Sequence, residues 1–344
     1  MRLYLFPLAV SLILGLSCSS PPPPPPLTGS VAFAVTTKDD AQVYLLDGKS
    51  DDPMMLPSDT RTPSFSRDGG ELYFAGAFKG KNEEFYQIKR LNLFTRNIET
   101  ISNGTANDDF PAPSPDGLQV AFISSPVGDS ESPEGVHWRL WLMDREGKNR
   151  RLLDPNGPKT QLEPSWSPDS SKIVYVTQQS LDQLFPADIK ERLQKGEKIP
   201  REELEKYIKQ FRSPLMVFDF ATGASKELTP PDVTASYPSW SPKGDLIAFT
   251  RQGTQNETSI WGIKPDGADL RPLTSGTSDS QPSINPDGQS LLFTREQDGK
   301  RVIWELNLQT LQERKFLEDV KGVQGIVALE RPRLGKFTPP AGKE

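Results

Sequence analysis

Cysteine and histidine are almost absent from this chain, which has one of each among its 344 residues. Cys18 has no partner for a disulfide bond, and together with His137 it cannot supply the three or four ligands of a zinc site. A Ser-His-Asp triad would have to use His137, yet the chain has no Gly-x-Ser-x-Gly motif to expose a nucleophilic serine. We therefore expect no cofactor, no metal site and no catalytic residue, and we predict that the protein is not an enzyme.

Long apolar runs are also missing after residue 18, so the sequence predicts no membrane-spanning helix beyond that point. The formal net charge is −6, which argues against nucleic acid as a partner. Most of the acidic pairs, which are Asp39–Asp40, Asp51–Asp52 and Asp108–Asp109, are expected to be solvated charges in turns, although a catalytic carboxylate pair needs only proximity in space.

An export signal is the first positive feature. Leu3–Leu16 is a short apolar core preceded by Arg2, which predicts a signal peptide over residues 1–17. The segment around Cys18 resembles a bacterial lipobox, in which this cysteine is acylated and becomes the mature N-terminus; an ordinary cleaved signal is the alternative. Ser19 resembles a signal for sorting to the outer membrane. We expect the protein in the bacterial cell envelope, on the periplasmic face of the outer membrane, and in contact with the membrane through the lipid anchor only.

Residues 18–29 would form the lipidated cysteine and a proline-rich linker. Six consecutive prolines, 21–26, would extend as polyproline II over roughly 20 Å. The alternative is a low-complexity linker with no such role.

Five near-identical segments dominate the rest of the chain. Their first prolines are spaced by 48, 53, 74 and 44 residues, and each segment leads into an alternating apolar run. The segments are Pro63–Gly69, Pro111–Gly117, Pro164–Ser170, Pro238–Gly244 and Pro282–Gly288. The Ser-Pro-Asp-Gly part predicts a tight turn between two strands. A period near 44 residues with strand-like content is typical of propeller blades.

The sequence thus predicts an all-β protein, a six-bladed β-propeller of four-stranded antiparallel blades spanning residues 30–333, with a tail at 334–344. The first repeat is incomplete, since Val31–Ala34 and Gln42–Asp47 match only the second and third strands of a blade. A strand at Val323–Glu330 has no blade of its own. We expect this C-terminal strand to close the ring and so to remove two open sheet edges.

These repeats resemble the WD-like propeller repeat of the TolB-like family. The resemblance rests on the five proline-serine segments and the aromatic strands after them, and it covers roughly residues 30–330. It implies the propeller fold and a role in the bacterial envelope. The same repeat occurs in peptidase propellers and in oligogalacturonate lyases, so it implies function only weakly. The N-terminal α/β domain of TolB has no counterpart here, and its functions are not carried over.

One insertion, residues 181–213, interrupts the pattern. Ile189 and Leu193 lie four residues apart, and Leu204, Ile208 and Phe211 share one helical face, so we expect two short helices. These helices would be either a structural flap on the propeller or a docking arm for a partner. Trp141, Trp261 and Trp304 recur at one repeat position, which favours packing between blades over a ligand-stacking platform.

The most plausible site is geometric, because the first strand of each blade lines the channel in this class of propeller. Residues just before each proline-serine segment would then converge at one mouth of the channel. The predicted partner-binding residues are Arg61, Asp109, Phe110, Glu163, Tyr237 and Gln281. This ring is mixed and slightly acidic, suited to a cationic segment of a partner or an ion, unless it is only a water-filled rim.

These observations together predict a monomeric, non-catalytic binding or scaffold propeller, tethered to the envelope, that engages a protein or peptide through the channel mouth and the helical insertion. The alternatives are a carboxylate-based glycan hydrolase or lyase, and a glycan-binding module. No nucleic acid partner is expected.

Overall fold

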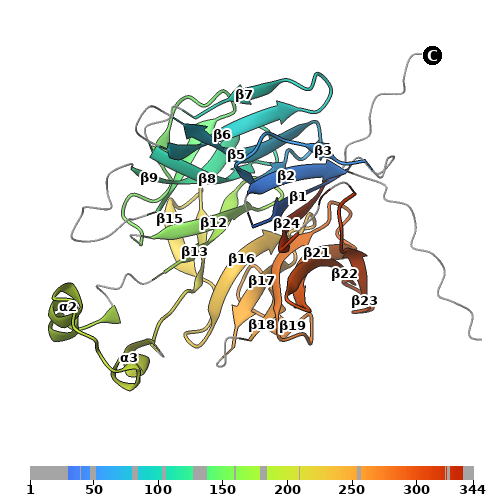
Figure 1. Cartoon of the computed structure of the whole chain (residues 1–344). Coiled ribbons are helices and arrows are strands. Elements are labelled where there is room, and N and C mark those ends of the chain that lie inside the picture. Colours follow the sequence, from blue (N-terminus) through green and yellow to red (C-terminus); the bar gives the residue numbers. More distant parts are fainter. Residues whose placement is uncertain are drawn as a thin grey trace, which may run out of the picture.

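The computed structural model consists of short strands, paired antiparallel except at one bridge, that form five sheets arranged in a ring (Figure 1). The structure describes residues 30–38, 40–46, 52–79, 84–102, 106–126, 138–158, 160–178, 184–208, 210–253, 257–321, 323 and 326–335. Four sheets have four strands each and form separate blades. They comprise β4 (Thr60–Phe65) to β7 (Ile98–Thr100), β8 (Ala106–Pro113) to β11 (Arg151–Leu152), β12 (Gln161–Trp166) to β15 (Ala224–Glu227), and β16 (Thr234–Trp240) to β19 (Arg271–Pro272).

Between these first and last strands lie the two middle strands of each blade. They are β5 (Glu71–Lys79) and β6 (Glu84–Asn92), β9 (Gln119–Pro126) and β10 (Arg139–Asp144), β13 (Lys172–Thr177) and β14 (Leu215–Asp219), and β17 (Ile247–Gln252) and β18 (Thr258–Ile263).

The remaining eight strands form one sheet, in the order β20-β21-β22-β24-β1-β2-β3 with β23 paired to β22. They are β1 (Ser30–Thr36), β2 (Ala41–Leu46), β3 (Met54–Met55), β20 (Asp279–Ile284), β21 (Ser290–Gln297), β22 (Lys300–Asn307), β23 (Glu313–Leu317) and β24 (Ala328–Gly335).

The prediction of six separate four-stranded blades is therefore wrong. Four blades are separate, and a single parallel bridge between Arg301 of β22 and Ala328 of β24 joins the other two groups of four strands into one sheet. The C-terminal strand begins at Ala328 rather than at Val323, and it pairs antiparallel with β1. The first strands contact one another in the order β4, β8, β12, β16, β20 and β24, and β24 contacts β4, so the ring is closed.

The repeated segment forms the turn that its residues predict. In the first copy the amide of Gly69 donates to the carbonyl oxygen of Ser66 at 2.9 Å, and the Ser66 hydroxyl donates to Asp68 at 2.6 Å. Equivalent hydroxyl–carboxylate bonds occur in the second and third copies. In the third copy, bonds from Ser167 and Ser171 lower the pKa of Asp169 to about 2. The motif is thus a structural connection between the first and second strands of a blade.

The core lies between neighbouring sheets. Each second strand buries one aromatic ring completely at the same repeat position, and these rings belong to Phe33, Phe74, Phe122, Tyr175, Phe249 and Phe293. One cluster, for example, joins Val174 and Val176 of β13 to Ile247 and Phe249 of β17. Burial of such rings and aliphatic side chains, at about 1.5–3 kcal/mol each, fixes the sheets around the channel.

The insertion between β13 and β14 contains two short helices, α2 (Ala187–Gln194) and α3 (Arg201–Ile208), as predicted. They stand to one side of the sheets (Figure 1). Arg192 connects them through Glu203 at 2.8 Å, and Phe185 and Tyr207 pack edge to face with ring centroids 5.8 Å apart. In the part of the chain that the structure describes, no helix is both long and apolar enough to cross a bilayer.

Candidate binding site in the central channel

Six first strands carry the same backbone irregularity where they line the channel. The residue before the proline has a positive φ of 52–57° in each of them, and the strand is bulged at this point. These residues are Thr62, Phe110, Glu163, Tyr237, Gln281 and Arg331. A positive φ is costly for a residue with a side chain, and such strain often accompanies function. We call these six residues the inner ring.

Four of the predicted site residues meet around Arg331, which the sequence analysis did not single out. The guanidinium of Arg331 lies 4.1 Å from the ring centroid of Phe110 and 5.2 Å from that of Tyr237. The Arg331 amide donates to the side-chain oxygen of Gln281 at 2.7 Å. The Glu163 carboxylate accepts a hydrogen bond from the Tyr237 amide. Five of the six inner-ring residues are therefore linked by direct contacts, whereas Thr62 bonds to Asp109 beside them.

Glu163 is set deep among these groups. Burial raises the pKa of its carboxyl group, while the Tyr237 amide, Arg331 and Arg333 oppose this shift. Burial also raises the pKa of the Tyr237 hydroxyl. Two guanidinium groups against one carboxylate leave at least one excess positive charge here, so this part of the channel is not acidic.

The other two predicted residues, Arg61 and Asp109, pair with each other beside this set. Arg61 lies 2.8 Å from Asp109, and the Thr62 hydroxyl donates to the same carboxylate at 2.7 Å. The guanidinium of Arg61 also covers the Tyr86 ring at 3.5 Å. The charge of Asp109 is thus compensated within the protein.

The expectation that Asp108 and Asp109 are solvated turn charges is wrong. Both lie in β8, Asp109 is 5% exposed and Asp108 is fully buried. Arg150 binds Asp108 through both nitrogens, at 2.9 and 3.1 Å. The physical reason is that a buried carboxylate must be paired, and Arg150 supplies the partner from the neighbouring turn.

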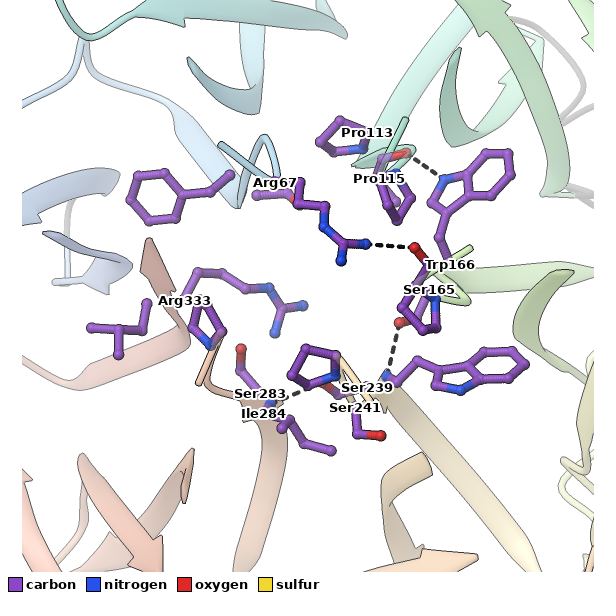
Figure 2. A pocket seen from close by; sticks show the side chains of 18 of the residues that line it. Arg67, Pro113, Pro115, Ser165, Trp166, Ser239, Ser241, Ser283, Ile284 and Arg333 are labelled. Atoms are coloured by element: carbon purple, nitrogen blue, oxygen red, sulfur yellow. Dashed lines mark hydrogen bonds between the residues drawn. The ribbon is translucent and has the colours of Figure 1, made fainter. Parts of the chain in front are cut away.

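The residues that directly follow these six prolines form a second ring. It consists of Ser64, Ala112, Ser165, Ser239, Ser283 and Arg333, and we call it the outer ring. It surrounds a cavity of about 230 Å³ that opens at one end of the channel (Figure 2). Trp166, Trp240 and seven prolines form much of the wall. A smaller cavity of about 40 Å³ continues inward past Arg331, and Arg333 lines both.

Arg333 is the unusual member of the outer ring. In the described part of the chain its guanidinium makes no hydrogen bond or ion pair. Figure 2 shows this group directed toward the middle of the cavity. Burial, and then repulsion from Arg331, lowers the pKa of Arg333 to about 10, although Glu163 acts in the opposite direction.

The sequence contained a signal for Arg331 and Arg333. Residues 331–333 repeat the x-Pro-x pattern of the five motif copies, but they lack the Ser-Pro-Asp-Gly turn because the chain ends its ring there. Among the described residues, no group of three or more histidine, cysteine or acidic side chains could hold a metal ion. Cys18 and His137 lie outside the described residues.

The recurring tryptophans of the third strands pack between sheets, as predicted. Trp141, Trp261 and Trp304 each pack against a core cluster. Each also lies beneath an arginine guanidinium, that of Arg150, Arg251 or Arg295, at 4.3–4.9 Å.

No family model matches the chain. An uncharacterized protein of Agrobacterium fabrum is 34% identical over 116 residues, which is 33% of this chain and 38% of the relative. The Tol-Pal system protein TolB of Gluconobacter oxydans is 44% identical over 59 residues, 17% of this chain and 13% of the relative. The chain thus matches well under half the length of these two curated relatives.

Solved structures agree on the fold. TolB from Acinetobacter baumannii superposes with a TM-score of 0.66 at 16% identity, over 91% of this chain and 68% of that one. A TolB homologue from Agrobacterium tumefaciens gives 0.54 at 17% identity, over 89% and 98%. An oligogalacturonate lyase in complex with manganese gives 0.51 at 19% identity, over 83% and 72%. The chain therefore has a TolB-like β-propeller fold, which enzymes also use.

Proposed function

We propose that this chain is a non-catalytic binding propeller of the bacterial cell envelope, which engages a protein or peptide partner at the mouth of its central channel. The observation that carries the proposal is the cavity of about 230 Å³ at one end of the channel, whose lining combines prolines and tryptophans with serine hydroxyls and arginines. Concave sites that combine apolar side chains with convergent polar groups are typical ligand sites. The likeness to TolB, a Tol-Pal system protein, supports an envelope role.

The proposed surface includes both rings. The inner ring and its neighbours contribute the residues that the sequence indicated, Arg61, Asp109, Phe110, Glu163, Tyr237 and Gln281. The outer ring contributes hydroxyl groups and Arg333, and the wall contributes Trp166 and Trp240. Tryptophan and arginine are the side chains that most often dominate binding energy in interfaces.

A photo-crosslinking experiment in producing cells tests this proposal. Benzoylphenylalanine replaces Phe65, which lines the cavity, or Phe94, which is 54% exposed away from it. We expect a discrete adduct from position 65 and none of that mass from position 94. The crosslinked protein is then identified and purified, and its affinity is measured for the wild type and for Trp240→Ala. A ten-fold or greater loss of affinity in Trp240→Ala would support the channel mouth as the binding site. The same adducts from both positions would refute it.

The helical insertion is the second proposed contact surface. Two observations support this: α2 and α3 stand to one side of the sheets (Figure 1), and an ion pair holds them together. Replacing residues 182–210 by a short linker removes both helices but spares Arg212 and Ser213, which bond to Pro231 and Ala235. We expect weaker partner binding with unchanged stability; unchanged binding would leave the insertion as a structural flap.

Envelope attachment through Cys18 is part of the same proposal. Labelling of growing cells with a radioactive fatty acid should mark the wild type and not Cys18→Ala. Labelling of both, or of neither, would contradict lipidation at this residue.

The enzymatic alternative has a direct test. Incubation with cell-wall glycans and acidic polysaccharides should give no products. Turnover that is abolished by Asp109→Asn or Glu163→Gln would overturn the non-catalytic assignment.

A further inference from the structure

The outer ring is a uniform feature with one exception. At five positions, one on each of β4, β8, β12, β16 and β20, the residue after the proline is serine or alanine, so the channel stays open there. On β24 the same position carries Arg333, whose side chain reaches into the cavity (Figure 2). A long charged side chain in a ring of small ones needs a reason beyond packing.

The guanidinium of Arg333, whose side chain is half-buried, makes no hydrogen bond or ion pair among the described residues, and Glu163 only attracts it from a distance. The charged groups around it are already engaged. Arg331 covers Phe110, Glu163 accepts the Tyr237 amide, and Arg67, which lines the same cavity, donates to the Pro168 carbonyl oxygen. Burying a charge without a partner is costly, so proteins normally pair such groups or use them for ligands. Arg333 therefore points to a ligand that supplies the missing acceptor.

Two hydroxyl groups of the same ring are also available as donors. Ser165 accepts the Trp240 amide at 3.1 Å, and Ser239 accepts the Ile284 amide at 2.9 Å (Figure 2). These bonds fix the oxygen positions and leave the hydroxyl protons free, because no described acceptor takes them. The cavity floor thus presents a cation and hydroxyl donors.

The lining of the cavity also indicates which kind of molecule would carry the negatively charged acceptor for Arg333. The prolines of the wall, together with the small exposed parts of Trp166 (7%) and Trp240 (8%), would contact an apolar or aromatic group better than a bare ion. A planar guanidinium binds a carboxylate through two parallel hydrogen bonds. An inorganic anion would satisfy Arg333 but would gain nothing from the walls.

We propose that Arg333 is the anchor for a carboxylate group attached to an apolar body, supplied by an acidic side chain or by the C-terminus of a peptide that enters the cavity. This inference rests on the proposed binding function and names the chemistry that the channel recognises.

Three tryptophan-free tripeptides test it with the full-length protein. N-acetyl-Phe-Glu-Phe-amide carries a side-chain carboxylate, N-acetyl-Phe-Gln-Phe carries a terminal one, and N-acetyl-Phe-Gln-Phe-amide is neutral. Trp166 and Trp240 line the cavity, so a change in tryptophan fluorescence reports binding. We expect one of the two acids to bind at least ten-fold more tightly than the neutral peptide, and that acid identifies the source of the carboxylate.

Matched variants link the preference to Arg333. Arg333→Met should bind all three peptides equally, at the affinity of the neutral one. Arg333→Lys keeps the charge without the two-pronged geometry, and it should keep part of the preference if Arg333→Met fails to fold. The control Arg271→Gln, whose side chain is 46% exposed on β19, should behave as the wild type.

Three results would overturn the inference. Equal binding of acidic and neutral peptides to the wild type would contradict recognition of a carboxylate but leave the proposed function intact. Competition by inorganic phosphate at or below the concentration of the best acid would indicate a simple anion site. No fluorescence change with any peptide at 10 mM would exclude the anchor role, whereas the crosslinking experiment would still decide the proposed function.

Discussion

Arg333 should lower the stability of the folded protein when no ligand is bound. The perturbation that measures this is Arg333→Met, which removes the charge and keeps a long unbranched side chain. The pKa of Arg333 is about 10 against the ordinary 12.5. At about 1.36 kcal/mol per pKa unit, this difference corresponds to roughly 3 kcal/mol by which the fold disfavours the charged guanidinium. The group remains charged at neutral pH, so the cost is present there.

We therefore expect Arg333→Met to be more stable than the wild type by about 1–3 kcal/mol at pH 7.5, after allowance for imperfect packing of methionine. Urea unfolding in a buffer without carboxylates measures this as a higher midpoint with an unchanged slope. A binding acid should reverse the order, because it stabilises only the wild type in proportion to its concentration.

The pH dependence of the free energy of unfolding checks the sign of this effect. The folded chain holds this proton less tightly than the unfolded chain, so between pH 10 and 12.5 the unfolded state binds more protons. Wild-type stability therefore gains from rising pH through this one group, and the advantage of Arg333→Met should shrink above pH 10. Comparing the two proteins at each pH cancels the titration of other groups.

One result would refute this reasoning. If Arg333→Met were less stable than the wild type by more than 1 kcal/mol at neutral pH without ligand, Arg333 would be making a stabilising contact. The control Arg271→Gln should change the free energy of unfolding by less than about 0.5 kcal/mol, since exposed pairs such as Arg271–Asp269 contribute little.

Two further predictions concern the scaffold. Gly147→Ala should unfold the protein or cost more than about 3 kcal/mol in urea unfolding, because φ is +81° and a Cβ would lie 1.7 Å from the Ile101 carbonyl oxygen; Gly223→Ala, with φ +65° and open space, should cost only about 1–2 kcal/mol, and equal losses would contradict the steric argument. Asp279→Asn should cost about 2–3 kcal/mol, because Asp279 is fully buried and binds Arg295 at 2.5 and 2.8 Å, and its loss leaves Glu313 as the one carboxylate bound to that guanidinium. A free energy of unfolding within about 0.5 kcal/mol of the wild type would show that water replaces the carboxylate.

The local structure of this fold was predictable because its signals are local. Each turn follows from at least two of proline, aspartate and glycine at fixed places within four residues, and the helices of the insertion follow from apolar spacing over eight. The number of separate sheets was not predictable in this way. It depends on the bridge between Arg301 of β22 and Ala328 of β24, which no local pattern of the sequence encodes. The burial of Asp108 was not predicted for the same reason, since its partner Arg150 lies 42 residues away.

The charge of the channel shows most clearly where local reasoning ends. Five inner-ring positions were identified from the residue before each proline, and with their neighbours they gave a slightly acidic ring. The sixth position comes from β24, which lies next to β1 and completes the ring with Arg331 and Arg333. These two residues change the charge of the channel from slightly negative to positive, and they bring the only guanidinium of the outer ring. In this ring the closing strand, β24, pairs with β1 and is the first strand least like the repeats. It can therefore differ at a position that the other strands keep small, and we infer that specificity for a carboxylate arises there.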